Sequence, residues 1–266
     1  MDQFIRVRRF LLEERELFGE TFIADDPART LPAVHASTTP MTVRKEPKIH
    51  TNPELFAEDA RALEPWQNAK SLDELNTMIR NCQRCELWKT RTNFVFGVGN
   101  PNATFMVIGE APGADEDEQG EPFVGRAGQL LNKILEAIGF KREDVYIANI
   151  LKSRPPNNAT PTLEQSEACK PYLKKQIALL KPKIILCVGR TAAQSLLGTN
   201  ESMAQLRGGR LFEYEGIPLM VTYHPAALLR NPNWKRPTWD DVQCARKTHD
   251  DIIKRESSAG AGDQVV

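Results

Sequence analysis

Short apolar runs alternate with amphipathic segments along the part of the chain that begins near residue 105. Three runs lack a helical period and have the length of buried strands; they cover residues 105–108, 145–151 and 184–188. Apolar positions recur on one face of the intervening segments, which predicts helices at residues 129–138 and 163–180. The pattern ends with paired strands and a last helix, at residues 211–214, 217–222 and 239–255. This alternation predicts an α/β fold with a mostly parallel sheet between helices on both faces.

The segment between the first strand and its helix holds the most unusual residues of the chain. A turn, Gly109-Glu110-Ala111-Pro112-Gly113, follows the strand, and its glycines permit backbone conformations that other residues rarely adopt. An acidic run and then an aromatic residue lead on to the helix. In an open α/β sheet, a ligand binds at such a strand end. The pattern therefore predicts a ligand site on this loop.

Polar residues lie at the ends of three predicted strands. Glu110, Asn149 and His224 are each at or just past such an end. The carboxyl ends of parallel strands share one edge, so these groups are expected to converge there with Phe123. Each residue alone has an ordinary structural explanation: asparagine forms turns, histidine before proline makes structural hydrogen bonds, and phenylalanine packs in cores. Their joint placement favours a binding site.

Outside the α/β pattern, the chain has an extension at its start and a tail at its end. Residues 1–19 predict an amphipathic helix, and residues 20–69, rich in Pro, Thr and Ala, predict a flexible linker. Ser71 and Glu74 fit the capping box of a helix at residues 71–81. The expected domains are an N-terminal extension, a main domain and a disordered tail, at residues 1–69, 70–256 and 257–266.

Composition narrows the function classes. The 266 residues carry 35 basic and 35 acidic side chains, so any nucleic-acid binding must come from a local basic face. A hydrophobic content of 41% supports a folded core. No run approaches about 18 uninterrupted apolar residues, and the first residues lack a signal-peptide core, so no membrane span is expected. Five cysteines, an odd number, fit a reducing compartment, and a cytoplasmic location is predicted.

Four motifs follow one another along the chain: GEAPG at 109–113, PFVGRAG at 122–128, NILKSRPP at 149–156 and HPAALLR at 224–230. In order and spacing they resemble the motifs of family 4 uracil-DNA glycosylases, over roughly residues 82–250. The resemblance implies a three-layer α/β/α fold around a mostly parallel four-stranded sheet. It also implies a monomeric DNA repair enzyme that acts on uracil-containing DNA. Such an enzyme flips uracil out and hydrolyses its N-glycosidic bond, which leaves an abasic site.

The resemblance also implies roles for residues around the base. Phe123 would stack on uracil. Asn149 would read it, because one amide offers the donor and the acceptor that match uracil O4 and N3–H but not the edge of cytosine. His224 would donate a hydrogen bond to uracil O2 as negative charge develops on the leaving base. Ala111 would contact the substrate, from a turn position where other uracil glycosylases carry an aspartate.

Without that aspartate, the sequence does not identify the group that orients the attacking water. Glu110 and Glu116 are the available carboxylates, and Asn158 is a third candidate. The other acids of this loop are expected to form a solvated surface: Asp115, Asp117 and Glu118.

The last motif is expected to meet DNA. Leu228 or Leu229 would enter the minor groove as a wedge, although both could equally begin a packed helix. Basic side chains near the same sheet edge are expected to face phosphates: Lys152, Arg154, Arg207, Arg210 and Arg230.

The cysteines suggest a second site. Cys82 and Cys85, spaced C-x-x-C, could by themselves hold zinc, iron or nothing. Family 4 enzymes hold a 4Fe–4S cluster with four cysteines, and the resemblance places Cys82, Cys85 and Cys169 at three of those positions. The fourth position is Ser153. A cluster normally needs four thiolates, so serine or water completes the set, or the cluster is labile or absent. The remaining two cysteines are expected to be packing residues: Cys187 and Cys244.

Two other function classes stay open. A DNA-binding module of the same fold with weak or no catalysis would need the basic residues but not Glu110, Phe123, Asn149 and His224. A small-molecule enzyme would use the glycine turn to bind phosphate. That turn is too short for a dinucleotide fingerprint, and the acidic run behind it would repel phosphate.

Overall fold

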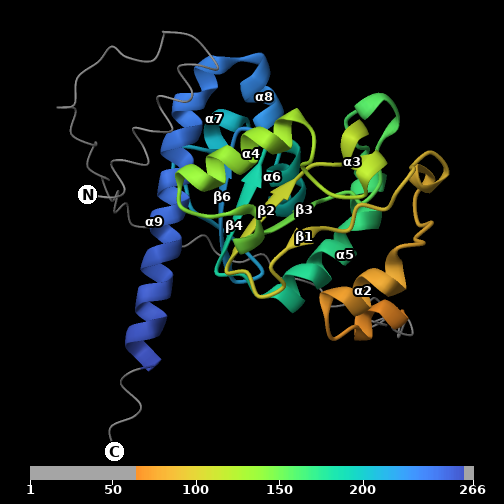
Figure 1. Ribbon diagram of the computed structural model, residues 1–266, viewed down its shortest axis with the longest axis horizontal. Coiled ribbons are helices and arrows are strands. Elements are labelled where there is room, and N and C mark those ends of the chain that lie inside the picture. Colours follow the sequence, from red (N-terminus) through yellow and green to blue (C-terminus); the bar gives the residue numbers. More distant parts are fainter. Residues whose placement is uncertain (1–63, 261–266) are drawn as a thin grey trace, which may run out of the picture. The chain divides into compact units, whose positions relative to one another are not determined.

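A six-stranded mixed sheet forms the centre of the protein in a computed structural model, which describes residues 64–260 (Figure 1). The strands are β1 Val98–Gly99, β2 Phe105–Gly109, β3 Tyr146–Asn149, β4 Ile184–Val188, β5 Phe212–Tyr214 and β6 Ile217–Thr222. Their order is β1-β3-β2-β4-β6-β5. The central strands β3, β2, β4 and β6 are parallel, whereas β1 and β5 are antiparallel to their neighbours. The parallel centre brings the carboxyl ends of four strands to one edge.

The edge strands correct the expectation of a four-stranded sheet. Strand β1 has two residues, too few for a hydrophobic period to show in the sequence. Strand β5 pairs with β6 in the expected hairpin, and this pairing makes the sheet mixed. The α/β class is confirmed.

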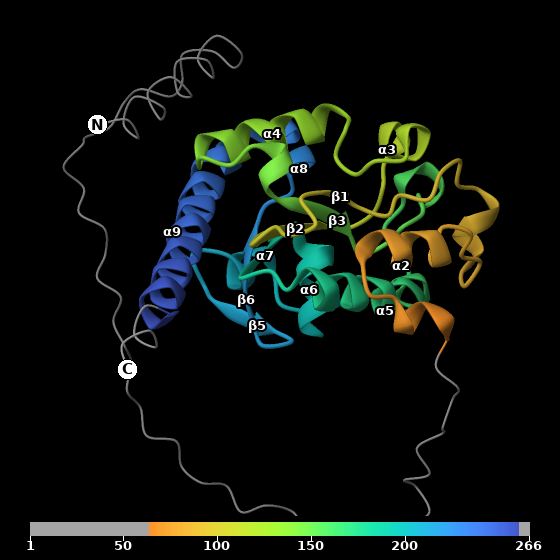
Figure 2. The same ribbon diagram turned by 60° about the horizontal axis from the view of Figure 1, so that its bottom comes forward.

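Helices cover both faces of the sheet. They are α2 Leu72–Ile79, α3 Ala114–Gln119, α4 Arg126–Ala137, α5 Leu163–Leu180, α6 Arg190–Leu197, α7 Met203–Leu206, α8 Pro225–Arg230 and α9 Lys235–Gly260. Short 3₁₀ helices are η2 Pro65–Asn68, η3 Glu86–Lys89, η4 Arg142–Asp144, η5 Pro156–Asn158 and η6 Pro232–Trp234. Helices α4, α8 and α9 pack on one face, and α2, α5, α6 and α7 on the other (Figures 1 and 2). None of the helices within residues 64–260 combines the length and the apolar character that a bilayer crossing requires.

The central strands are apolar because both faces of the sheet are covered. Every residue of β2, β3 and β4 is buried. Along β2, Phe105 and Val107 pack with α4 and α9, while Met106 and Ile108 pack in the opposite layer. This two-sided burial explains why these strands appear in the sequence as uninterrupted apolar runs.

The folded domain begins earlier than the expected boundary at residue 70. Trp66 and Ala69 belong to the hydrophobic core, with exposed fractions of 8% and 2%. The Trp66 ring makes an edge contact with Tyr172 of α5, at 4.8 Å between centroids. One aromatic anchor thus attaches the segment 64–69 to the domain.

The C-terminal helix also differs from its expected bounds. Helix α9 begins at Lys235 and continues to Gly260, whereas the sequence predicted residues 239–255 and a tail from 257. The rest of the tail, 261–266, and the N-terminal extension up to residue 63 lie outside the described residues.

Replacing Trp66 by alanine is expected to lower the melting temperature by roughly 5–15 °C, because a large buried ring is removed from the core. Thermal unfolding followed by circular dichroism would measure the shift. Trp88 is the matched control, since its ring is 37% exposed and Trp88→Ala leaves the core intact. Equal shifts for the two variants would contradict the assignment of residues 64–69 to the folded domain.

Candidate active site

The carboxyl ends of β2, β3 and β6 bring the predicted residues together. Gly109 ends β2 and is the register partner of Asn149, which ends β3. His224 follows β6 and is the N-cap residue of α8. The rings of Phe123 and His224 are stacked, with centroids 5.5 Å apart and an interplanar angle of 28°. A Cβ at Gly109 would lie 2.4 Å from Asn149 Oδ1 and 2.6 Å from Phe123 Cζ, so only glycine permits this approach.

The amide of Asn149 is prepared for a ligand. The residue is 2% exposed, and its Oδ1 is buried without a hydrogen-bond partner among residues 64–260. An unsatisfied buried acceptor costs about 1–3 kcal/mol. A ligand that offers an N–H group to this oxygen would remove that cost.

Phe123 is held in an unusual conformation. Its φ is 54°, in the left-handed region that a non-glycine residue rarely occupies. Gly128 lies against the Phe123 backbone, because a Cβ there would come within 1.9 Å of the Phe123 carbonyl oxygen. The Arg142 side chain donates to the carbonyl oxygens of Phe123 and Pro122, at 3.0 and 2.6 Å. Strain of this kind persists where the surroundings fix it, and such residues cluster at ligand sites.

His224 is a neutral donor at physiological pH. Its Nδ1 accepts a hydrogen bond from the Ala226 backbone N–H at 3.1 Å, so the ring proton is on Nε2. Burial lowers the pKa of His224 to about 4, and the nearby Arg230 contributes to the decrease. The ring can therefore offer Nε2–H to a ligand without carrying a charge.

Glu116 holds the active-site loop together. One carboxylate oxygen accepts from Gly113 N–H at 3.0 Å, and the other accepts from the N–H groups of Val124 and Gly125 at 3.0 and 3.1 Å. This carboxylate therefore joins the glycine turn to the segment that follows Phe123. Its oxygens are committed to the backbone, which favours a positioning role over water activation.

Glu110 and Asn158 are the other candidates for orienting water. The Glu110 side chain is half-buried and has no hydrogen bond or ion pair with another residue in the part of the chain that is described. Asn158 is exposed, and its Oδ1 accepts from Arg154 Nε at 2.8 Å. Of the three candidates, Glu110 alone combines a carboxylate with a place next to the strand end.

One acid of the loop is not solvated as expected. Asp117 is 4% exposed, and its carboxylate accepts hydrogen bonds from the backbone N–H groups of Thr92 and Asn93. It attaches the segment before β1 to α3. Asp115 and Glu118 are exposed, as predicted.

Two basic residues predicted to face DNA have other partners. Lys152 is fully buried, and its Nζ donates to the Asn149 carbonyl oxygen at 2.8 Å. Arg207 forms a two-bond ion pair with Asp241, at 2.9 and 3.0 Å. The prediction for Lys152 is wrong, because a sequence position after a strand end does not reveal whether the side chain turns inward. Arg207 is 18% exposed and has its guanidinium committed to Asp241.

The other basic residues of the predicted set remain accessible. Arg230 is exposed at the end of α8. Arg210 is 51% exposed while it pairs with Glu201. Arg154 is partly exposed and bonded to Asn158.

The two leucines of α8 have different environments. Leu228 is 1% exposed and belongs to the core beneath α4, so it cannot act as a wedge. Leu229 is partly exposed at the same helix. The wedge prediction is therefore restricted to Leu229.

Sequence reasoning missed Arg142 and the role of Gly128. Arg142 lies on η4, in another part of the chain, and no motif marks it. Gly128 had a visible signal, because a glycine near the start of an amphipathic helix indicates close backbone packing.

The cysteine site lies where α5 meets the segment that precedes β1. Tyr172 donates to Cys82 Sγ at 3.3 Å, and the neighbouring Cys169 lowers the pKa of Cys85 to about 6. The fourth position, Ser153, is 2% exposed and accepts from Arg91 Nη1 at 3.0 Å. Within residues 64–260, no group of three or more His, Cys, Asp or Glu side chains is arranged to hold a metal ion. Three thiols and a hydrogen-bonded hydroxyl do not fit a four-thiolate cluster.

Of the remaining cysteines, one is in the core and the other is partly buried against it. Cys187 is fully buried in β4, and burial raises the pKa of its thiol. Cys244 of α9 packs against the opposite cluster.

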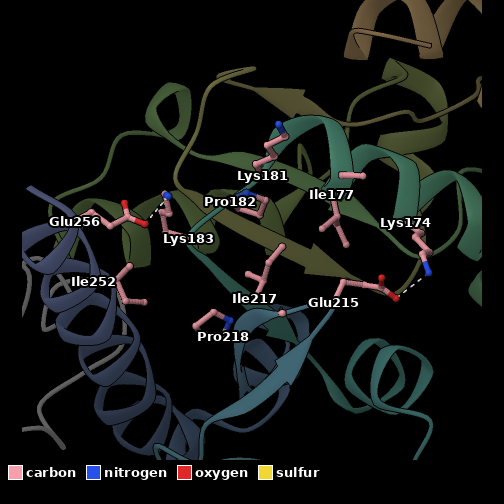
Figure 3. A pocket seen from close by; sticks show the side chains of 12 residues that line it. Lys174, Ile177, Lys181, Pro182, Lys183, Glu215, Ile217, Pro218, Ile252 and Glu256 are labelled. Carbon is pink, nitrogen blue, oxygen red and sulfur yellow. Dashed lines mark hydrogen bonds and ion pairs between the residues drawn. The ribbon is translucent and has the colours of Figure 1, made fainter. Parts of the chain in front are cut away.

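A groove of about 570 Å³ lies away from the candidate site, between α5, the β5–β6 turn and α9 (Figure 3). Two of its lysines are paired, Lys174 with Glu215 at 2.9 Å and Lys183 with Glu256 at 2.5 Å, and Lys181 also lines it. None of the predicted site residues lines the groove.

Known proteins resemble this chain in sequence. The sequence profile of the "Uracil DNA glycosylase superfamily" matches residues 96–243. A type-4 uracil-DNA glycosylase of Archaeoglobus fulgidus is 46% identical over 182 residues, which cover 65% of this chain and 91% of that protein. A type-4 enzyme of Thermotoga maritima is 39% identical over 70% of this chain and 96% of that protein. A segment that covers 15% of a DNA polymerase of Bacillus phage SP01 is 29% identical over 52% of this chain.

The matched region contains every strand end that forms the candidate site, and the motifs that suggested the family lie on the loops at those ends. The resemblance inferred from the sequence is thereby confirmed: the chain belongs to the uracil-DNA glycosylase superfamily.

Proposed function

We propose that this protein is a uracil-DNA glycosylase that removes uracil from DNA and leaves an abasic site for repair. The observation that carries the proposal is the buried Oδ1 of Asn149, which has no hydrogen-bond partner within residues 64–260 and lies beside the ring of Phe123. Uracil offers an N–H group at N3 and a flat face, which complement an amide oxygen and an aromatic ring.

Base recognition combines stacking with hydrogen bonds. A flipped uracil stacks on Phe123, while the Asn149 amide accepts from N3–H and donates to O4. Cytosine has no hydrogen at N3 and presents an amino group where uracil has O4. An acceptor would then face the amide oxygen of Asn149, and a donor would face its NH₂ group. The wrong base would leave buried polar groups without hydrogen-bond partners, and this free-energy cost discriminates uracil from cytosine.

Bond cleavage depends on charge stabilisation. As the N-glycosidic bond breaks, its electron pair moves to the base, and negative charge develops on uracil O2. His224 Nε2–H donates to that oxygen as a neutral group held in place by the Ala226 N–H. The sugar then carries positive charge and accepts a water molecule.

We assign the orientation of that water to Glu110. Its carboxylate is free of protein partners in the described residues and follows directly after β2. A carboxylate there can accept a proton from water and stabilise the cationic sugar. Glu116 supports the site by fixing the loop, and Ala111 leaves room for the base beside the turn.

We assign contacts with the DNA backbone to the accessible residues around the same edge of the sheet. Arg230 and Leu229, on α8, follow directly from the His224 cap. Contacts to phosphate by Arg230 and by Arg154 and Arg210 would give salt-dependent binding. Leu229 would fill the space that the flipped base leaves.

The 4Fe–4S cluster implied by the resemblance has no part in these steps. Cys82, Cys85 and Cys169 supply three thiols, and Ser153 supplies a hydroxyl. The reaction as described uses only residues at the strand ends.

The five cysteines, which are all free thiols, support a cytoplasmic location. Action as a monomer is a prediction that sedimentation of the purified protein would check.

The function is tested by incubating the full chain with an oligonucleotide that contains one uracil and then cleaving abasic sites with alkali. Strand cleavage that depends on uracil is expected, and the same oligonucleotide with thymine is the control. Binding of the uracil oligonucleotide without release of free base would instead identify a DNA-binding module of this fold.

The two loop carboxylates are distinguished by conservative variants. Glu110→Gln is expected to lower the single-turnover rate about 100-fold with an unchanged melting temperature, because a general base is lost. Glu116→Gln is expected to cost about 1–3 kcal/mol of stability, because an NH₂ group replaces one acceptor facing the backbone. If instead Glu116→Gln is fully stable and inactive, the two roles are exchanged.

A further inference from the structure

The fourth position of the cysteine site is part of a hydrogen-bond network. Arg91 Nη1 donates to Ser153 Oγ at 3.0 Å, and Nη2 donates to the Arg80 carbonyl oxygen at 3.2 Å. The same guanidinium lies over the ring of Phe94, 5.1 Å from its centroid. Three contacts thus fix Arg91 against the serine hydroxyl.

The sulfur of Cys82 also has protein partners. Cys82 Sγ accepts hydrogen bonds from the Arg84 backbone N–H at 3.4 Å and from the Tyr172 hydroxyl at 3.3 Å. Cys82 and Ser153 are therefore both hydrogen-bonded within the protein.

Apolar packing holds the surrounding elements without a metal. Leu75 and Ile79 of α2 are 0% and 2% exposed, and they share one hydrophobic cluster with Tyr172 and Leu173 of α5. Trp66 packs on the edge of Tyr172 in the same cluster. Burial on this scale stabilises the junction.

The chemistry of Ser153 opposes ligation of a cluster. Soft thiolates select iron–sulfur clusters, whereas a hydroxyl is a hard ligand that keeps its proton at neutral pH. Ser153 and Cys169 are 2% and 4% exposed, so a water molecule has little access as a substitute ligand.

We infer that this chain keeps Cys82, Cys85, Cys169 and Ser153 as a metal-free, hydrogen-bonded junction, and that Ser153→Cys alone converts the junction into a 4Fe–4S site. The substitution would supply the fourth thiol that a four-thiolate cluster requires. Ser153 and the three cysteines take no part in the proposed excision steps, so the metal content of the junction can be tested independently of the glycosylase function.

The test is anaerobic reconstitution of the full chain with ferrous iron and sulfide, followed by desalting and measurement of iron, sulfide and visible absorbance. The wild type is expected to retain almost no iron, and Ser153→Cys about four irons per chain with a brown colour. Ser195→Cys is the matched control. It adds a cysteine on α6, at a buried hydroxyl that has no hydrogen-bond partner within residues 64–260, and is expected to remain colourless.

Wild-type protein that retains about four irons, and loses them in Ser153→Ala, would overturn the inference by showing ligation through serine. A colourless Ser153→Cys protein that is folded by circular dichroism would overturn its second half. Thermal unfolding gives an independent result: a strong iron chelator is expected to leave the melting temperature of the wild type unchanged. A drop of several degrees would mean that a metal holds the junction. Excision assays on the same samples report separately on the glycosylase function.

Discussion

Asn149→Ala is expected to lower uracil excision about 100- to 1000-fold while binding of undamaged DNA stays the same. The reason is that the variant removes a buried amide whose oxygen lacks a partner within residues 64–260, and with it both proposed hydrogen bonds to the base. The strand end itself is kept, because β3 pairs with β2 through backbone atoms. Single-turnover excision and fluorescence anisotropy with a labelled oligonucleotide would measure the two properties.

Asn102 provides the control for this variant. It is an exposed asparagine in the turn before β2, and Asn102→Ala is expected to excise uracil at the wild-type rate. Turnover by Asn149→Ala at the wild-type rate would remove the base-reading role from this residue and with it the main support for the pocket.

His224→Asn is expected to lower the excision rate about 100-fold with little loss of stability. Asparagine can still cap α8 by accepting from the Ala226 N–H, but it lacks the ring nitrogen that would reach the base. His224→Ala removes the cap as well, so it is expected to lose a similar rate and about 1 kcal/mol of stability. A wild-type rate in His224→Asn would assign leaving-group stabilisation to another group.

The pH dependence follows from the direction of the shift. The folded-state pKa of His224 is about 4, below its ordinary value of 6.5. Between these values the unfolded chain binds the proton first, so this residue's contribution to stability is present above pH 6.5 and decreases as the pH falls toward 4. Excision that depends on the neutral ring is expected to be level across pH 6–8. The melting temperature of the wild type should fall more steeply below pH 6.5 than that of His224→Asn.

The convergence of the site was predictable because parallel strands end at a common edge. Glu110 follows β2, Asn149 ends β3 and His224 lies two residues after β6, so their placement at one edge required only the alternation of strands and helices. The stacking of Phe123 on His224 agrees with the same argument. The two-residue strand β1 was not predictable. It is a strand because it pairs with β3, and its own residues show no hydrophobic pattern.

The errors arose where side-chain direction or a distant partner decides the outcome. Lys152 follows β3 directly, yet its ammonium group turns back to the Asn149 carbonyl. Arg207 is paired with Asp241, which lies 34 positions along the chain on α9, and sequence alone gives no register between them. Glu116 was predicted from the sequence as a candidate for orienting water, and its backbone partners lie on either side of Phe123. Three backbone N–H groups converge on it only after the loop has closed.

That closed loop has a kinetic consequence. Glu116 and Arg142 hold the segment around Phe123 before any DNA binds. Binding of a base therefore costs little free energy for ordering that segment. Free uracil meets the same prepared surface after the DNA has left. The released base should therefore compete with new substrate, and product inhibition is the cost of a pocket assembled in advance.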